Sequence, residues 1–253
     1  MNKELIKSIR QKLKNNEPSI GSWMQIPNSS ISEIMGQAGY DWITVDLEHG
    51  SISVHQLPDL FRAIQMGGTL PLARLANPSP NDCKQALDAG AGGIIISMVE
   101  NAKQVAEIRK ACCWPPVGNR GVGFSRANLF GKHFDEYQQE AQSPMIIAQI
   151  EHINAVNNLE EILQEEGLDA IIVGPYDLSA SMGITAQFEN TQFKKILTKI
   201  MEACVEHNVT CGYHVVEPKL ENVTKRISQG YKFIAYCSDG IFLNTSSRCL
   251  IKK

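Results

Sequence analysis

The chain has 253 residues, of which 43% are hydrophobic and 20% are charged, and this is the composition of an ordinary globular protein. Its formal net charge of -3 leaves no basic excess for a nucleic-acid partner, although a local pocket could still bind an anionic small molecule. No apolar run approaches the roughly 20 residues needed to span a bilayer, and the polar N-terminus MNKELIKSIRQKLKNN does not have the apolar core of a signal peptide. The seven cysteines, an odd number with no CxxC pair, are expected to be reduced thiols in the cytoplasm.

The first predicted element is an amphipathic helix over residues 2–15, part of an N-terminal segment 1–18, with apolar side chains near helical spacing. Eight short apolar or β-branched runs follow along the chain. They are continuous rather than alternating, which is typical of parallel strands that are buried on both faces. These predicted strands cover residues 21–24, 42–45, 70–73, 93–96, 145–148, 170–173, 210–213 and 233–236.

Helical patterns with polar residues at the start and glycine near the end separate many of these runs. We expect helices near residues 30–38, 53–65, 80–89, 101–110, 154–165, 193–207 and 217–228. Eight strands alternating with helices over this length predict a (β/α)8 barrel, with residues 1–253 forming one domain. A doubly wound sheet is the alternative, but no GxGxxG motif follows the first strand.

Residues 115–143 interrupt this rhythm. They contain no strong strand pattern and are rich in glycine, arginine, asparagine and aromatic residues. A long irregular insertion in a compact domain usually has a function. We therefore expect this segment to form a lid over the active site or an interface.

Ionisable side chains follow the second and third predicted strands. The motif Asp46-Leu47-Glu48-His49 ends one strand and Arg74 ends the next, in the region where barrel enzymes keep their catalytic groups. An imidazole suits proton transfer near neutral pH, and an arginine can bind a carboxylate or stabilise a developing enolate. The alternatives are a surface role for His49 and a structural ion pair between Arg74 and Asp46 or Glu48.

A second group of polar residues follows the fifth and sixth predicted strands. Gln149 and Glu151 share an orientation by two-residue alternation, and Asp177 lies in the motif Gly174-Pro175-Tyr176-Asp177-Leu178-Ser179. Two carboxylates at neighbouring strand ends, completed by water and substrate oxygens, suit Mg²⁺ or Mn²⁺. The amides near Tyr176 could face an anion after the tight turn at Gly174. The alternative is a solvated acidic rim without a metal.

These motifs, in this order, resemble the HpcH/HpaI aldolase family of metal-dependent 2-oxo-acid aldolases, over about residues 21–243. The carriers of the resemblance are Trp42-Ile43-Thr44-Val45-Asp46-Leu47-Glu48-His49-Gly50, Ala73-Arg74, Leu87-Asp88-Ala89-Gly90-Ala91, Gly118-Asn119-Arg120-Gly121-Val122-Gly123, Gln149-Ile150-Glu151 and Gly174-Pro175-Tyr176-Asp177-Leu178-Ser179.

The resemblance implies a (β/α)8 barrel that forms a homo-oligomer, often a hexamer built as a trimer of dimers, with a terminal helix exchanged between neighbours. It implies reversible aldol cleavage of a 4-hydroxy-2-oxo acid, possibly sugar-derived, to pyruvate and an aldehyde with Mg²⁺, Mn²⁺ or Co²⁺.

By the same resemblance, each site residue receives a role. His49 would be the base, Asp88 would pair with it, and Arg74 would stabilise the enolate. Glu151 and Asp177 would bind the metal, while Gln149 and the backbone at Tyr176 and Asp177 would hold the pyruvate moiety. Without the resemblance, Asp88 is an ordinary residue at the end of a helix.

The chain departs from the family pattern at Ser97-Met98-Val99, Tyr213-His214-Val215-Val216 and Tyr236-Cys237-Ser238-Asp239. These changes suggest a bulkier or more polar aldehyde, whose hydroxyls His214 could contact unless it is simply packed. Two other functions stay open. One is a citrate or malyl-CoA lyase, although no basic cluster for coenzyme A is evident, and the other is a non-catalytic barrel subunit.

Overall fold

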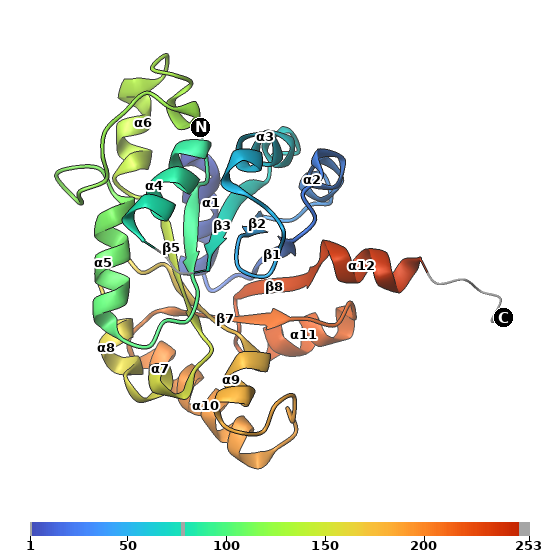
Figure 1. The fold of residues 1–253 in the computed structure, drawn as a ribbon. Coiled ribbons are helices and arrows are strands. Elements are labelled where there is room, and N and C mark those ends of the chain that lie inside the picture. Colours follow the sequence, from blue (N-terminus) through green and yellow to red (C-terminus); the bar gives the residue numbers. More distant parts are fainter. Residues whose placement is uncertain (1, 77–78, 248–253) are drawn as a thin grey trace.

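The computed structural model describes residues 2–76 and 79–247. Eight parallel strands close into a barrel in chain order, with β1 paired to both β2 and β8 (Figure 1). The strands are β1 Ser19–Met24, β2 Trp42–Asp46, β3 Leu70–Leu75, β4 Gly93–Ile96, β5 Met145–Ile150, β6 Ala170–Val173, β7 Thr210–Val215 and β8 Phe233–Ser238. Each of the eight predicted strands is present, and the predicted (β/α)8 barrel is confirmed.

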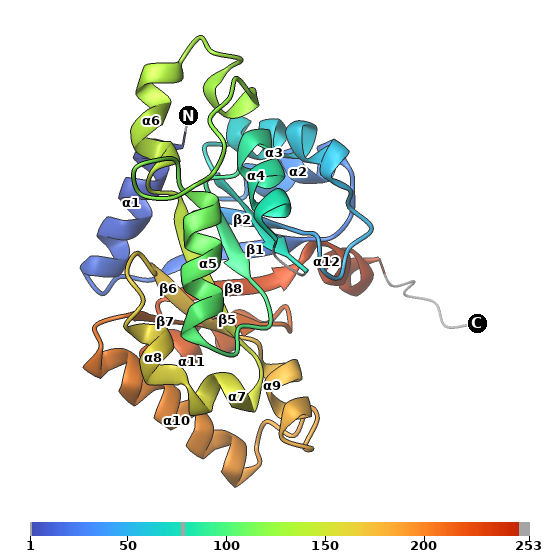
Figure 2. The ribbon, with the colours of Figure 1, turned by 60° about the vertical axis from the view of Figure 1, so that its left-hand side comes forward.

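The helices surround this barrel (Figures 1 and 2). They are α1 Lys3–Lys14, α2 Ser29–Gly36, α3 Leu57–Met66, α4 Pro80–Ala89, α5 Ala102–Cys112, α6 Phe134–Ala141, α7 Ile153–Asn157, α8 Leu159–Leu163, α9 Pro175–Ser181, α10 Thr191–Glu206, α11 Leu220–Ser228 and α12 Asp239–Ser246, with short 3-10 turns at η1 Val54–Gln56 and η2 Arg126–Asn128. Among the helices of the described residues, none is long and apolar enough to cross a membrane.

Three details differ from the sequence prediction. The helix expected over 154–165 is interrupted at Asn158, whose side-chain amide donates to the backbone carbonyl of Glu100 at 2.8 Å, because asparagine competes well with helical backbone bonding. The segment 115–143 is not wholly irregular, since it contains η2 and α6. Helices α9 and α12 follow β6 and β8 directly, and the sequence analysis did not predict them.

Two-residue alternation along the strands separates two hydrophobic cores. One set of side chains packs between the strands and the outer helices. The other fills the barrel interior, where the Trp42 and Phe233 rings stack with centroids 4.4 Å apart. Ile6 and Ile9 of α1 are buried against this inner core. The interior is therefore packed solid at its amino-terminal end, and a site can open only at the carboxyl ends of the strands.

Gly21 makes room for the inner core. A Cβ at this position would lie 2.0 Å from the Trp42 ring, which is itself fully buried. We expect Gly21→Ala to destabilise the fold by about 2 kcal/mol or more, because an added methyl group must displace a packed indole. Urea unfolding monitored by tryptophan fluorescence measures this change.

Gly123→Ala is the matched control, since nothing lies within 4 Å of a Cβ added there. A Gly21→Ala variant as stable as Gly123→Ala would contradict the predicted clash.

Candidate active site

The inward-facing side chains change from apolar to polar at the carboxyl ends of the strands. On β3, Leu70 and Leu72 belong to the inner core and Arg74 is the next residue on that face. On β2, Trp42 is followed on the same face by Thr44 and then by Asp46, which pairs in register with Arg74. The polar layer therefore sits on top of a packed apolar interior.

Asp46 and Arg74 form a buried bidentate ion pair. Arg74 Nε donates to Asp46 Oδ1 at 2.9 Å and Nη2 donates to Oδ2 at 2.5 Å, and both residues are at most 5% exposed. Burial would raise the pKa of Asp46, but the hydrogen bonds and charge of Arg74 outweigh it and hold that pKa below its usual range. The pair is therefore charged at neutral pH.

Other contacts fix the guanidinium of Arg74. Its Nη1 lies 2.9 Å from Glu48 Oε2, and its central carbon lies 4.4 Å above the Trp23 ring. The Gln25 amide donates to Asp46 Oδ2 at 2.9 Å. These contacts orient the cation and still leave N–H donors of Arg74 uncommitted for a substrate oxygen.

His49 lies in the loop after β2. The backbone amides of Glu48 and His49 donate to Asp46 Oδ1 at 3.0 and 3.3 Å, a side-chain turn that aspartate commonly makes. The His49 side chain is 59% exposed, and its Nε2 lies 3.9 Å from Glu48 Oε2. The imidazole is therefore accessible to a substrate, next to a carboxylate that can stabilise its protonated form.

Glu151 faces this layer from the end of β5. It accepts hydrogen bonds from the Met98 backbone amide at 2.6 Å and from the Gln149 side chain at 2.5 Å. Met98 adopts a positive φ of 49°, a conformation that costs free energy in a residue with a side chain. Burial raises the pKa of Glu151 to about 7, and the nearby carboxylates of Glu48 and Asp177 add to the increase.

The hollow at the mouth of the barrel has a volume of about 240 Å³. Five of the residues predicted from the sequence line it: His49, Arg74, Gln149, Tyr176 and Asp177. Asp177 lies in the first turn of α9 and is exposed. Glu151, the sixth predicted residue near the hollow, is buried beneath it and bonded to Gln149.

Asp88 is not part of this group. It lies near the end of α4, just before β4 begins, and therefore at the opposite end of the barrel from His49. Its carboxylate lies 3.9 Å from Arg120 Nη1. The structure does not bring Asp88 and His49 together within one chain.

Trp23 and Gln25 were not expected at the site, and Met98 was named only within the departure Ser97-Met98-Val99. Trp23 and Gln25 share the inward face of β1 by alternation, and this signal could have found them. Met98 contributes a backbone amide from a loop 53 residues away from Glu151, and no side-chain pattern can indicate such a contact.

The residues at the mouth fit a divalent cation bound largely by oxygen atoms. Three carboxylates, Glu48, Glu151 and Asp177, are close enough to disfavour ionisation of Glu151, and a bound cation would relieve this repulsion. Among the described residues, Gln149 Oε1 is buried without a hydrogen-bond partner. Within the described part of the chain, no group of three or more His, Cys, Asp or Glu residues is arranged to hold a metal. For a cation held by Glu151 and Asp177, water and substrate oxygens would complete the coordination shell.

The family model for the HpcH/HpaI aldolase/citrate lyase family matches residues 19–245. The chain is 31% identical to the hydroxypyruvate/pyruvate aldolase of Roseobacter denitrificans over 98% of this chain and 97% of that protein. It is 33% identical to the 2-keto-3-deoxy-L-rhamnonate aldolase of Salmonella gallinarum, over 93% and 88%. A crystal structure of a family member from Burkholderia cenocepacia superimposes with a TM-score of 0.88 at 28% identity, covering 95% and 96% of the two chains.

The relatives that match nearly the whole chain are aldolases, so the chain is an enzyme of the carbon–carbon lyase class. The chain belongs to the HpcH/HpaI aldolase/citrate lyase family, as the resemblance of its motifs implies. The non-catalytic barrel considered above is therefore dropped.

Glu151 should make the stability of the metal-free protein depend on pH. The pKa of Glu151 is about 7 in the folded protein and 4.5 as the ordinary value. Above pH 4.5 the unfolded chain therefore loses this proton more readily than the folded protein does. The folded state loses stability as pH rises from about 4.5 through about 7. Between pH 5 and pH 8, we expect the wild type to lose on the order of 2 kcal/mol of unfolding free energy relative to Glu151→Gln. Urea unfolding with EDTA at both pH values measures this difference.

Glu166→Gln is the control, because the Glu166 side chain is 88% exposed. Equal pH dependence in the wild type and in Glu151→Gln would show that Glu151 ionises normally in the folded state.

Proposed function

We propose that the chain catalyses the reversible, divalent-cation-dependent aldol cleavage of a 4-hydroxy-2-oxo acid to pyruvate and an aldehyde. The observation that carries this proposal is the shared hollow at the barrel mouth. An accessible imidazole, an oriented arginine and an exposed carboxylate all face the same space. The names of the relatives, a pyruvate aldolase and a 2-keto-3-deoxy sugar-acid aldolase, support the same reaction.

The cleavage requires a base and a place for negative charge. The His49 imidazole would take the proton of the 4-hydroxyl, and the oxygen electron pair would form the aldehyde carbonyl as the C3–C4 bond breaks. The bond electrons would pass to the pyruvate fragment as an enolate, which becomes pyruvate when C3 gains a proton. Glu48, 3.9 Å from His49 Nε2, would stabilise the imidazolium that forms.

Arg74 would stabilise the enolate oxygen through its uncommitted N–H donors. Its own charge pairs with Asp46 and Glu48, so its position is fixed before the substrate binds, as electrostatic catalysis requires. Gln149 and the backbone at Tyr176 and Asp177 would hold the pyruvate moiety.

Glu151 and Asp177 are the residues that would hold the cation, which we propose to be Mg²⁺, Mn²⁺ or Co²⁺. When bound, such an ion acts as a Lewis acid on the 2-oxo-acid group. The crowding of Glu48, Glu151 and Asp177 and the unpartnered Gln149 oxygen support this assignment.

Asp88 can take part only if a second copy of the chain supplies it. Within one chain, Asp88 and His49 lie at opposite ends of the barrel. The pairing implied by the family resemblance therefore requires a homo-oligomer, which we propose to be a hexamer. Two features support such an assembly. Helix α12 extends away from the barrel (Figure 1) with Leu243 51% exposed, and Phe124 and Phe130 of the 115–143 segment are 72% and 69% exposed.

The proposed base is tested by His49→Ala. We expect cleavage to fall by about 10²–10⁴-fold, the usual contribution of a general base, while cation binding is retained. The assay follows pyruvate released from 4-hydroxy-2-oxo acids through lactate dehydrogenase, with Mg²⁺, Mn²⁺, Co²⁺ or EDTA.

His55→Ala is the matched control, since His55 is exposed on the neighbouring turn η1 and does not line the hollow at the barrel mouth. Near-normal turnover by His49→Ala would remove the assigned role, and full activity in EDTA would remove the cation from the proposal.

The proposed ligand Asp177 is tested by calorimetry. Asp177→Ala should weaken Mn²⁺ binding at least about tenfold, because it removes one of two carboxylates that hold the ion. Asp135→Ala is the control, since Asp135 also lies in the first turn of a short helix, α6. An unchanged Mn²⁺ titration in Asp177→Ala would exclude it as a ligand.

A further inference from the structure

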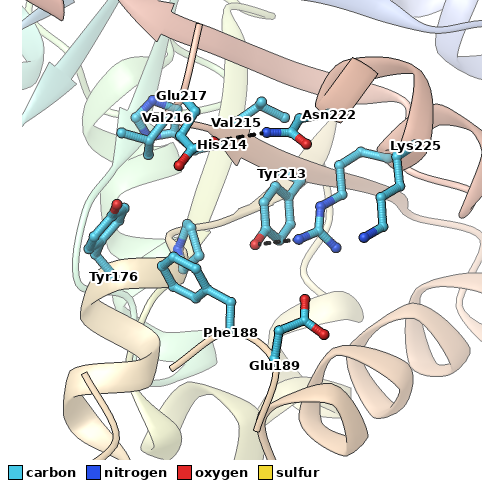
Figure 3. Close-up of a pocket in the computed structure, with 12 residues that line it drawn as sticks. Tyr176, Phe188, Glu189, Tyr213, His214, Val215, Val216, Glu217, Asn222 and Lys225 are labelled. Atoms are coloured by element: carbon cyan, nitrogen blue, oxygen red, sulfur yellow. Dashed lines mark hydrogen bonds between the residues drawn. The ribbon is translucent and has the colours of Figure 1, made fainter. Parts of the chain in front are cut away.

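A second hollow adjoins the first at the ends of β6 and β7 (Figure 3). The two hollows share Pro175, Tyr176, His214 and Val216 as lining residues. The second one then continues toward α11 and the segment that follows α9. The second hollow therefore offers a direction in which the non-pyruvate half of a substrate bound at Arg74 can extend.

His214 stands where the two hollows meet. By alternation from Gly212 it faces the barrel interior, in the same polar layer as Arg74, and its ring centroid lies 5.4 Å from that of Trp23. Its Nε2 is buried and has no hydrogen-bond partner within residues 2–76 and 79–247. A buried polar atom without a partner costs free energy, and such an atom in a substrate hollow indicates a group that arrives with the ligand.

Burial and the nearby positive charge of Arg74 lower the pKa of His214 to about 3. The imidazole is therefore neutral at physiological pH. One of its nitrogens carries a proton and the other offers a lone pair.

The backbone of Cys237 determines which nitrogen carries that proton. Cys237 has a φ of 57°, and the register between β1 and β8 shifts beside it, which is the mark of a β-bulge. The bulged backbone bonds the His214 ring and partly raises its pKa, so the ring donates to a carbonyl. Because Nε2 is the unpartnered nitrogen, Nδ1 is the donor and Nε2 is left as an acceptor.

Four charged side chains line the second hollow, two acidic (Glu189 and Glu217) and two basic (Lys225 and Arg226), and Lys225 adds to the charge of Lys194 in lowering the pKa of Glu189. Glu189 pairs with Lys194, and Glu217 lies 3.0 Å from Lys219. Arg226 donates to the Tyr213 hydroxyl at 2.9 Å and lies over its ring. Acidic and basic side chains balance around an aromatic wall, so the hollow suits a neutral polar fragment better than an anion.

We propose that the second hollow holds the aldehyde half of the substrate, and that His214 Nε2 accepts a hydrogen bond from a hydroxyl beside the reacting carbonyl. The substrate class is then a neutral 2-hydroxyaldehyde, so His214 is a specificity-determining residue. This inference rests on the proposed function, because it needs an aldehyde to be made or consumed at Arg74. A site that bonds a substrate hydroxyl discriminates strongly against an analogue that lacks it, because the acceptor then stays unpaired.

The test runs in the direction of aldol addition, with pyruvate and Mn²⁺, and compares lactaldehyde with propionaldehyde, which lacks only the 2-hydroxyl. We expect the wild type to prefer lactaldehyde by at least tenfold in kcat/KM. His214→Leu should bring this ratio close to one, and His214→Gln, which restores an acceptor, should recover part of it. His207→Leu is the control and should keep the full ratio, since His207 lies at the end of α10 outside both hollows.

Three outcomes would overturn the inference. They are a wild-type ratio near one, a ratio that survives in His214→Leu, and a preference of the wild type for the anionic succinic semialdehyde over lactaldehyde. The wild-type comparisons decide the matter even if His214→Leu does not fold.

Deuterium exchange into the methyl group of pyruvate, followed by NMR, separates this inference from the proposed function because it needs no aldehyde. Wild-type exchange with Mn²⁺ but no hydroxyl preference would reject the role of His214 alone. The absence of both exchange and aldol addition would reject the proposed function and this inference together.

Discussion

The buried ion pair between Asp46 and Arg74 is the contact around which the polar mouth of the barrel is arranged. Removing two charges from water is costly unless each is fully bonded, and here Asp46 also accepts the amide of Gln25 and two backbone N–H groups of its own loop. The same carboxylate thus positions the arginine and shapes the turn that carries His49. Loss of either Asp46 or Arg74 would leave the other charge buried next to the apolar core without its ion-pair partner.

The barrel could be predicted from sequence because its strands are continuous apolar runs of the length that parallel strands require. The polar layer could be predicted for a related reason. Leu70 and Leu72 are followed on one face by Arg74, and Ile147 by Gln149 and Glu151, so alternation marks where each strand leaves the core. The motifs and the alternation together predicted His49, Arg74, Gln149, Tyr176 and Asp177 as site residues. All five line one hollow in the structure.

What sequence reasoning missed depends on contacts between distant segments. The Met98 amide that bonds Glu151 and the Cys237 bulge that bonds His214 are backbone features, and side-chain patterns contain no trace of them. Asp88 shows a different limit. A motif can single out a residue and still say nothing about which end of the barrel, or which copy of the chain, it occupies.

The stacked Trp42 and Phe233 rings, with α1 packed against the amino-terminal end of the barrel, affect how small molecules enter and leave the site. In the described part of the chain the barrel interior is closed at its amino-terminal end, so water, protons and small molecules enter and leave at the carboxyl ends of the strands. In the proposed reaction, the fragment bound at Arg74 would leave only after the other half has cleared the opening. The order of product release would then follow from a tryptophan and a phenylalanine that contact neither product.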